Sequence, residues 1–242
     1  FRRVLRVSEW TGAPVYFVHV SATQGLNAVL EARSNGRPVY GETLHNYCCF
    51  GSENYKEENG MKYHTYPSLK SEADRQSLWD GIVNNGLSTM ATDEYCTSWE
   101  TKISGRSVAD VTGGHNGAEA RMGVTYSEGV SRRGMSLQRF VDVSSANAAK
   151  IMGLYPRKGV LAPGSDADIT LIDTNFKRKL TIDDFHISDY SIWEGFEADG
   201  WPVTTLLRGN VVVDNREFKS TLGSGKFIPR KVDSAVTNRP VA

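Results

Sequence analysis

Residues 14–44, PVYFVHVSATQGLNAVLEARSNGRPVYGETL, decide the fold class of this chain. The segments 14–20 and 38–44 are rich in β-branched and aromatic side chains, so each predicts a buried strand. Between them, 23–34 has the apolar spacing of a helix, and Gly36 ends it. A strand, a helix and a second strand predict a parallel pair, because parallel neighbours need a crossover connection.

The same alternation continues further along the chain. Residues 71–74, Ser-Glu-Ala-Asp, resemble a capping box that starts a second helix, and Gly86 ends this helix. Residues 87–92 then predict a third strand. The polar stretch 52–68 is too long for a simple connection, which indicates a functional loop. Three strands of this kind predict an α/β fold with a parallel sheet, and they are too few to close a (β/α)₈ barrel, which normally takes about 250 residues.

The character of the sequence changes after Pro156. Residues 169–172 predict a strand. The segments 203–207 and 211–213 flank Arg208-Gly209-Asn210, which is typical of a hairpin turn. We therefore expect an all-β portion in the second part of the chain.

Helical patterns precede this change and cover about 118–155, with Ser144 or Ser145 as a plausible N-cap. These patterns divide the chain into an α/β portion, an all-β portion and a polar tail. The expected boundaries are 1–158, 159–215 and 216–242.

The composition is that of an ordinary soluble globular protein. Lys and Arg number 28, as do Asp and Glu, so net charge gives no reason to expect nucleic acid or an anionic membrane as partner. No apolar run approaches the roughly 20 residues that cross a bilayer. The three cysteines, Cys48, Cys49 and Cys96, are too few for a disulfide framework and indicate reduced thiols in a cytoplasmic protein.

Two residues at predicted strand ends could bind a metal ion. His19 lies late in the first strand, and Asp93 follows the third. The carboxyl ends of parallel strands meet at one edge of a sheet, where the active sites of (β/α)₈ barrels lie. A neutral imidazole and a carboxylate suit a divalent cation. The alternatives are an ordinary core histidine at His19 and a helix cap or loop residue at Asp93.

Other polar residues give weaker signals. Glu42 and His45 could form an acid–imidazole pair, although supporting or loop roles are favoured. His64 could contact substrate, although a solvent-facing loop position is favoured. His115 is ambiguous, and His186 has no assigned role. The glycine-rich segment around His115 matches no phosphate-binding fingerprint, and a serine-hydrolase elbow is absent from the sequence.

Several strings together resemble the dihydropyrimidinase and D-hydantoinase branch of the cyclic amidohydrolases. They cover nearly the whole chain in family order: PVYFVHVSA (14–22), EARSNGRPVYGETL (31–44), SLWDGIVNNGLSTMATDEYCTS (77–98), GHNGAEARM (114–122), SSANAAKIMGLYPRKG (144–159), APGSDADITLID (162–173) and GSGKFIPRK (223–231). The resemblance implies strands 6–8 of a (β/α)₈ barrel, part of a β-sandwich, and missing sequence upstream of Phe1.

The resemblance also implies a binuclear site with two divalent ions, zinc in the first place and manganese or cobalt as alternatives. His19 matches the sixth-strand histidine of the family, and Asp93 matches the eighth-strand aspartate that also moves a proton. The H-x-H pair and the carboxylated lysine have no counterpart here and belong to the missing upstream part. Tyr66 and Asn116 match positions whose backbone groups hold the cyclic amide substrate.

Departures from the family pattern concern substrate choice. Tyr66-Pro67-Ser68-Leu69-Lys70 stands for the usual Ser-Pro-Pro-Leu-Arg, and Asp93-Glu94-Tyr95 for a common Asp-His-Cys. The implied reaction is ring opening of a hydantoin or 5,6-dihydropyrimidine to an N-carbamoyl amino acid. The alternative is a metal-free scaffold of the collapsin response mediator type, which the retained His19 and Asp93 disfavour. The family pattern further implies a homotetramer, and the chain by itself is expected to bind metal weakly and not turn over.

Overall fold

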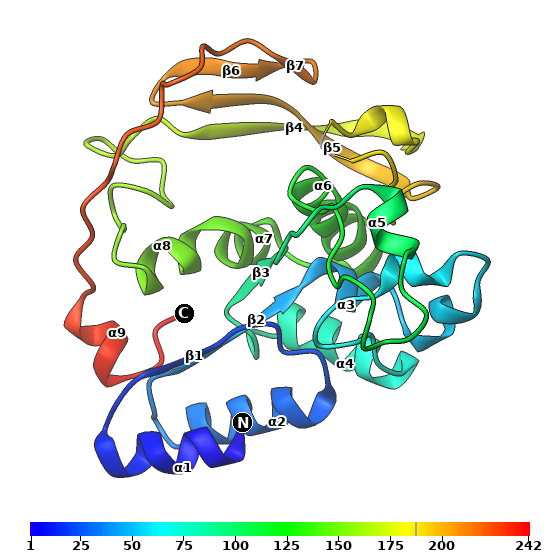
Figure 1. Ribbon diagram of the computed structural model, residues 1–242. Coiled ribbons are helices and arrows are strands. Elements are labelled where there is room, and N and C mark those ends of the chain that lie inside the picture. Colours follow the sequence, from blue (N-terminus) through cyan, green and yellow to red (C-terminus); the bar gives the residue numbers. More distant parts are fainter. Residues whose placement is uncertain (187) are drawn as a thin grey trace.

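The computed structural model describes residues 1–186 and 188–242. It contains a parallel sheet of order β1-β2-β3 and an antiparallel sheet of order β4-β5-β6-β7, with helices between them (Figure 1). The strands are β1 (Val15–Phe17), β2 (Val39–Leu44), β3 (Thr89–Ala91), β4 (Ile169–Lys179), β5 (Glu197–Leu207), β6 (Asn210–Asp214) and β7 (Glu217–Phe218).

Most helices are short, and two of them continue into π-helical turns. The α-helices are α1 (Arg2–Thr11), α2 (Thr23–Ser34), α3 (His45–Cys49), α4 (Glu72–Val83), α5 (Trp99–Ile103), α6 (Arg121–Thr125), α7 (Leu137–Val141), α8 (Asn147–Ile151) and α9 (Ser234–Asn238). The π-helical turns are η3 (Tyr126–Ser131) and η4 (Asp142–Ala146), and the 3₁₀ turns are η1 (Ser52–Lys56), η2 (Gly60–Tyr63) and η5 (Ile182–Asp184).

The predicted parallel sheet is confirmed. β1 pairs in parallel with β2, and β2 with β3. The helices α2 and α4 cover one face, where Val29, Leu78 and Ile82 are fully buried. A Cβ atom at Gly41 would lie 2.8 Å from the Leu87 side chain, so glycine lets β2 approach its neighbours closely.

Polar groups occupy the opposite face of the parallel sheet. The Tyr16 hydroxyl lies 2.6 Å from the Glu42 carboxylate and 2.7 Å from the Thr89 hydroxyl, so one side chain from each strand joins this network. Tyr40 lies on the same face and donates to the Val236 carbonyl in α9 (2.8 Å). The chain after β7 thus crosses the molecule and packs on the parallel sheet (Figure 1).

The last residue also packs at the amino-terminal ends of the parallel strands. The Ala242 carbonyl oxygen accepts hydrogen bonds from Arg33 Nη1 (2.6 Å) and from Ser88 Oγ (3.0 Å). Ser88 directly precedes β3. The predicted tail is therefore ordered at its end and contributes Val236 to a small apolar cluster with Tyr40.

The N-cap predicted at Ser144 or Ser145 is wrong. The helix begins earlier, at Leu137, where the Ser136 hydroxyl accepts the Arg139 amide (3.1 Å). Ser144 lies inside this helix and donates to the Phe140 carbonyl, four residues back. A serine in a helix interior satisfies its hydroxyl in this way, so its presence alone does not mark a start.

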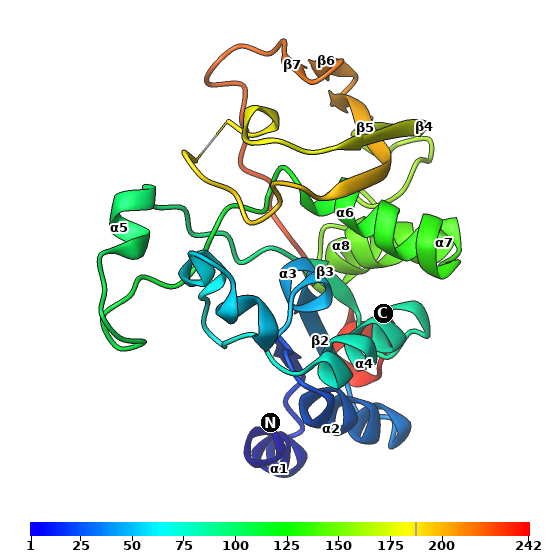
Figure 2. The same ribbon diagram turned by 90° about the vertical axis from the view of Figure 1, so that its right-hand side faces the viewer.

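The antiparallel sheet contains the predicted hairpin. Leu207 pairs with Asn210, and the intervening Arg208 and Gly209 have φ values of 50° and 80°, as tight two-residue hairpin turns require. β4 and β5 extend well beyond the predicted segments, because their added residues pair through the backbone without an apolar alternation. The helices α6 to α8 lie between this sheet and the parallel sheet in both views (Figure 2).

Among the described residues, none of the helices combines the length and the apolar character that crossing a membrane requires.

Candidate active site

The carboxyl ends of β1 and β3 carry the two predicted metal ligands. β1 ends at Phe17 and β3 at Ala91, so His19 and Asp93 each follow two residues later. Both strands pair in parallel with β2, so both residues lie at the same edge of the sheet. β1 and β3 are separated by two inter-strand spacings, about 10 Å. Side chains that extend toward each other from both strands can reach one shared ion across this distance.

Both residues have the same unusual backbone conformation. The φ value of His19 is 40° and that of Asp93 is 46°. A left-handed conformation costs residues other than glycine roughly 1–2 kcal/mol, although Asp and His tolerate it better than most. Strain of this kind gathers at functional sites, where it aims a side chain.

Neither side chain is engaged elsewhere in the described part of the chain. Among residues 1–186 and 188–242, no hydrogen bond or ion pair joins the His19 ring or the Asp93 carboxylate to another residue. Asp93 is exposed and His19 is half-buried. An imidazole and a carboxylate with open donor atoms fit a divalent cation of the zinc type.

The Asp93 charge reaches the Tyr47 hydroxyl. Burial raises the pKa of Tyr47 above its ordinary value, and the Asp93 carboxylate adds to this effect. Tyr47 donates to the Pro67 carbonyl (2.7 Å), so Asp93 lies near the segment that holds Tyr66.

Two ligands do not complete a metal site. Within the described residues, no group of three or more His, Cys, Asp or Glu side chains could hold a metal ion. Protein zinc sites normally use at least three protein ligands. A metal ion bound by His19 and Asp93 would need further ligands beyond these two.

Tyr66 lies on the loop between η2 and α4. Its side chain is 54% exposed, and its hydroxyl donates to the Val108 carbonyl (3.0 Å). The ring lies against Gly113, where an added Cβ would come within 2.4 Å of the ring. His64 meets the ring edge-on, with 4.7 Å between centroids.

Asn116 lies in the loop before α6 and is 1% exposed. Its side chain exchanges hydrogen bonds with the Ser191 hydroxyl at 3.0 and 3.1 Å. Its carbonyl oxygen accepts the Trp193 indole N–H (3.0 Å) and lies 3.0 Å from His115 Nδ1. The position of this loop is thus fixed by buried contacts.

Glu42 and His45 do not form a pair. Glu42 binds the Tyr16 hydroxyl on the sheet, whereas the His45 ring stacks on Trp193 with 4.5 Å between centroids. His45 Nε2 lies 3.1 Å from the Gly117 carbonyl. Burial holds the pKa of His45 well below its ordinary value, and His115 adds to this effect. The supporting role favoured for His45 agrees with these contacts.

The solvent-facing position predicted for His64 is wrong. His64 is 4% exposed, and burial lowers the pKa of its ring, with the Lys102 charge acting in the same direction. The prediction failed because the loop folds against α5, a contact between segments well separated in sequence. His186, which had no assigned role, has an exposed ring whose Nδ1 lies 2.6 Å from the Glu119 carboxylate.

Two further residues, neither of them singled out by the sequence analysis, hold the loop at Asn116. The Glu94 carboxylate accepts the backbone N–H groups of Gly117 (2.5 Å) and Ala118 (2.6 Å). Lys102 in α5 is fully buried and donates to the Gly114 carbonyl (2.5 Å). The one available signal was the position of Glu94 directly after Asp93.

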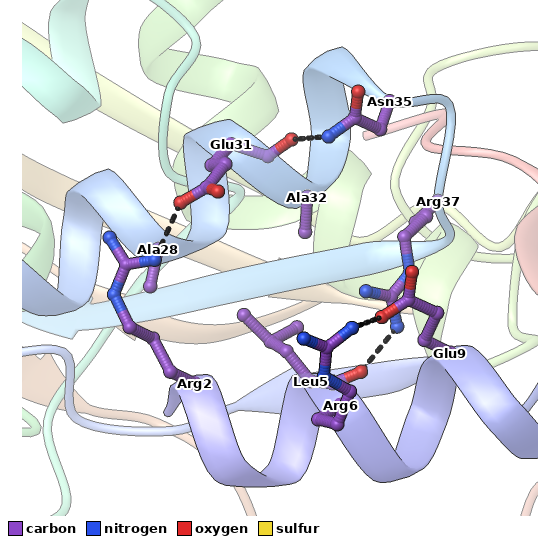
Figure 3. A pocket seen from close by; sticks show the side chains of 9 residues that line it. All are labelled: Arg2, Leu5, Arg6, Glu9, Ala28, Glu31, Ala32, Asn35 and Arg37. Atoms are coloured by element: carbon purple, nitrogen blue, oxygen red, sulfur yellow. Dashed lines mark hydrogen bonds and ion pairs between the residues drawn. The ribbon is translucent and has the colours of Figure 1, made fainter.

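A hollow of about 650 Å³ between α1 and α2 is a poor candidate for the active site (Figure 3). Arg2 and Arg6 at its rim pair with glutamates at 2.9 and 3.1 Å. Arg37, which donates to the Leu5 carbonyl (2.6 Å), precedes β2 and so lies at the amino-terminal end of the strand. Barrel active sites lie at the other end.

Comparisons with known proteins match this arrangement. Residues 18–212 match the sequence profile of the Amidohydrolase family. The D-phenylhydantoinase of Escherichia coli O1:K1 / APEC is 37% identical over 234 residues, which cover 95% of this chain and 50% of that protein. This chain therefore spans about half the length of the curated relatives it matches.

Solved structures agree with the sequence relatives. The D-hydantoinase (dihydropyrimidinase) from Thermus sp. superposes with a TM-score of 0.91 at 34% identity, over 94% of this chain and 51% of that chain. The dihydropyrimidinase from Brevibacillus agri NCHU1002 gives a TM-score of 0.91 at 32% identity, over 95% of this chain and 51% of that chain.

Proposed function

This chain belongs to the amidohydrolase family, and from that premise we propose that it supplies part of the active site of an enzyme that hydrolyses cyclic amides. The proposed substrates are hydantoins or 5,6-dihydropyrimidines, which open to N-carbamoyl amino acids. The observation that carries the proposal is the matching pair of strained residues with open donor atoms, His19 and Asp93, at the ends of two parallel strands.

We further propose that β1, β2 and β3 are strands 6, 7 and 8 of a (β/α)₈ barrel. Residues 1–158 then form the barrel portion, 159–215 a portion of a β-sandwich and 216–242 a tail. The parallel sheet in the first part of the chain and the antiparallel sheet in the second support this division, and coverage of about half of each relative leaves room for the other strands of a barrel. The sheet face with Tyr16 and Glu42 would then line the barrel interior.

In this proposal, His19 and Asp93 are metal ligands, and a carboxylated lysine with further histidines lies in the preceding half. The complete site would hold two divalent ions, zinc in the first place and manganese or cobalt as alternatives. Bound metal of this kind supplies a water nucleophile at neutral pH and polarises the substrate carbonyl.

Asp93 is proposed to act also as general base and acid. Its carboxylate has no other described partner, so it can accept a proton from the attacking water and deliver it to the leaving amide nitrogen. Tyr66 and Asn116 would hold the amide ring through backbone groups, which for Asn116 means the N–H, because its carbonyl and its side chain already bind Trp193 and Ser191. We also propose a homotetramer in the cytoplasm, where the three free thiols would stay reduced.

The proposal is tested on the native protein, meaning this chain together with any residues that flank it in its natural form. Ring opening of hydantoin and dihydrouracil is followed by appearance of the N-carbamoyl product, and bound metal is measured by mass spectrometry. Asp93→Asn should lower kcat by about a hundredfold or more, the usual contribution of a general acid or base. His19→Asn should lower metal content together with activity.

The matched control is His186→Asn, since His186 is a histidine with an exposed side chain and no place in the proposed metal site. It should retain both activity and metal. Wild-type turnover by Asp93→Asn would contradict the proposal. A native protein that takes up no metal and opens neither ring would favour the scaffold alternative.

A further inference from the structure

Lys102 in α5 is buried completely, with a side-chain exposure of 0%. Its ammonium donates to three carbonyl oxygens, those of His64 (2.7 Å), Thr112 (2.9 Å) and Gly114 (2.5 Å). An ammonium has three N–H donors, so every donor is used.

The charge of Lys102 has only carbonyl partners. Within residues 1–186 and 188–242, no carboxylate pairs with the ammonium. Burial lowers the pKa of Lys102 to about 8, whereas the three carbonyl oxygens favour the charged form. Burial of a charge is unfavourable unless its hydrogen bonds are complete, so the three oxygens have to stay in place around it.

These oxygens come from two segments that lead to the proposed substrate positions. His64 lies two residues before Tyr66, and Gly114 lies two residues before Asn116. The segments also touch directly, since the His64 carbonyl accepts the Gly114 amide (3.0 Å). α5 also packs beside η2, the 3₁₀ turn that directly precedes His64.

We propose that Lys102 is a positioning residue that holds the two loops carrying Tyr66 and Asn116 at the spacing that binds a cyclic amide. This inference rests on the proposed function. Backbone groups can recognise a flat amide ring only if the two loops keep a fixed separation. A single ammonium between three carbonyl oxygens fixes that separation without contacting the substrate.

The test compares Lys102→Met with Lys56→Met in the native protein. Methionine keeps most of the length of the side chain and removes its charge. Lys56 is 74% exposed and pairs with Glu53 (2.6 Å), so its loss is a matched control. Lys102→Met should raise KM for the cyclic amide by about tenfold, with kcat changed by less than about threefold, because the loops bind substrate and Asp93 stays in place. Metal content should be unchanged.

A second measurement does not depend on turnover. Backbone hydrogen exchange around Gly114 should become about tenfold faster or more in Lys102→Met and stay unchanged in Lys56→Met, because the segment loses its clamp. If exchange is faster in Lys102→Met but the native protein opens neither ring, the proposed function is rejected while the role of Lys102 in holding the two loops is retained. Unchanged KM and unchanged exchange in a folded Lys102→Met protein would overturn the positioning role.

If Lys102→Met does not fold, Lys102→Arg tests the positioning role of Lys102. A guanidinium is planar and cannot direct three N–H groups from one nitrogen at three converging oxygens. KM should therefore rise by about threefold or more while metal content stays constant. A wild-type KM in this variant would overturn the proposal.

Discussion

Acidification should destabilise the native protein through His115. The ring is 2% exposed, and burial lowers its pKa from the ordinary 6.5 to about 4. Below pH 6.5, His115 binds a proton in the unfolded chain but stays neutral in the folded chain until about pH 4. The free energy of unfolding therefore falls as the pH decreases. From these two pKa values, the loss attributable to His115 between pH 7 and pH 5 is about 2 kcal/mol, and it stops growing below about pH 4.

The assay is urea-induced unfolding at pH 7 and pH 5, followed by tryptophan fluorescence. Trp193 is a suitable reporter because its indole shares the Asn116 carbonyl with the His115 ring. His115→Asn removes the titrating group and leaves the other buried histidines, so the variant should lose about 2 kcal/mol less than the wild type over this interval. An equal loss in both proteins would refute the assignment to His115.

Two substitutions test the packing around the site by urea unfolding. Glu94→Ala should cost about 1–3 kcal/mol, because two backbone N–H groups before α6 lose their acceptor, whereas Glu100→Ala on the exposed side of α5 should change stability by less than about 0.5 kcal/mol. Gly123→Ala should cost about 1–3 kcal/mol, since its Cβ would lie 2.1 Å from the Trp201 ring, and Gly225→Ala, with open space around it, should cost far less. If Glu100→Ala lowered the free energy of unfolding as much as Glu94→Ala, or Gly225→Ala as much as Gly123→Ala, the structural reason given for that pair would be wrong.

The sequence predicted the parallel sheet well because its strands are short apolar runs bounded by glycine. Buried strands such as β2 have this local signature, and helix α2 ends at the predicted position before Gly36. The long strands β4 and β5 were predicted only in part. Much of β4 is exposed, so its pairing rests on backbone hydrogen bonds that leave no apolar pattern in the sequence.

The candidate site divides in the same way. His19 and Asp93 could be found because each follows an apolar strand directly, and the strand end fixes where they lie. Lys102 could not be found, because its burial depends on oxygens up to 38 residues away in the chain. The burial of His64 was missed for the same reason, since nothing local distinguishes a covered loop from an exposed one.

The strain at Asp93 leads to a further test of how the strand end is built. At φ 46°, the Cβ atom of an alanine destabilises the backbone by roughly 1–2 kcal/mol, whereas glycine has no Cβ atom and adopts this conformation freely. Glycine costs about 1 kcal/mol more than alanine in a helix, so at exposed Asp80 in α4 the alanine variant should be the more stable of the two. At position 93 the order should reverse, with Asp93→Gly more stable than Asp93→Ala by about 1 kcal/mol in urea unfolding. An alanine variant as stable as the glycine variant at position 93 would show that the backbone there is not strained, so that strain would not mark Asp93 as a functional residue.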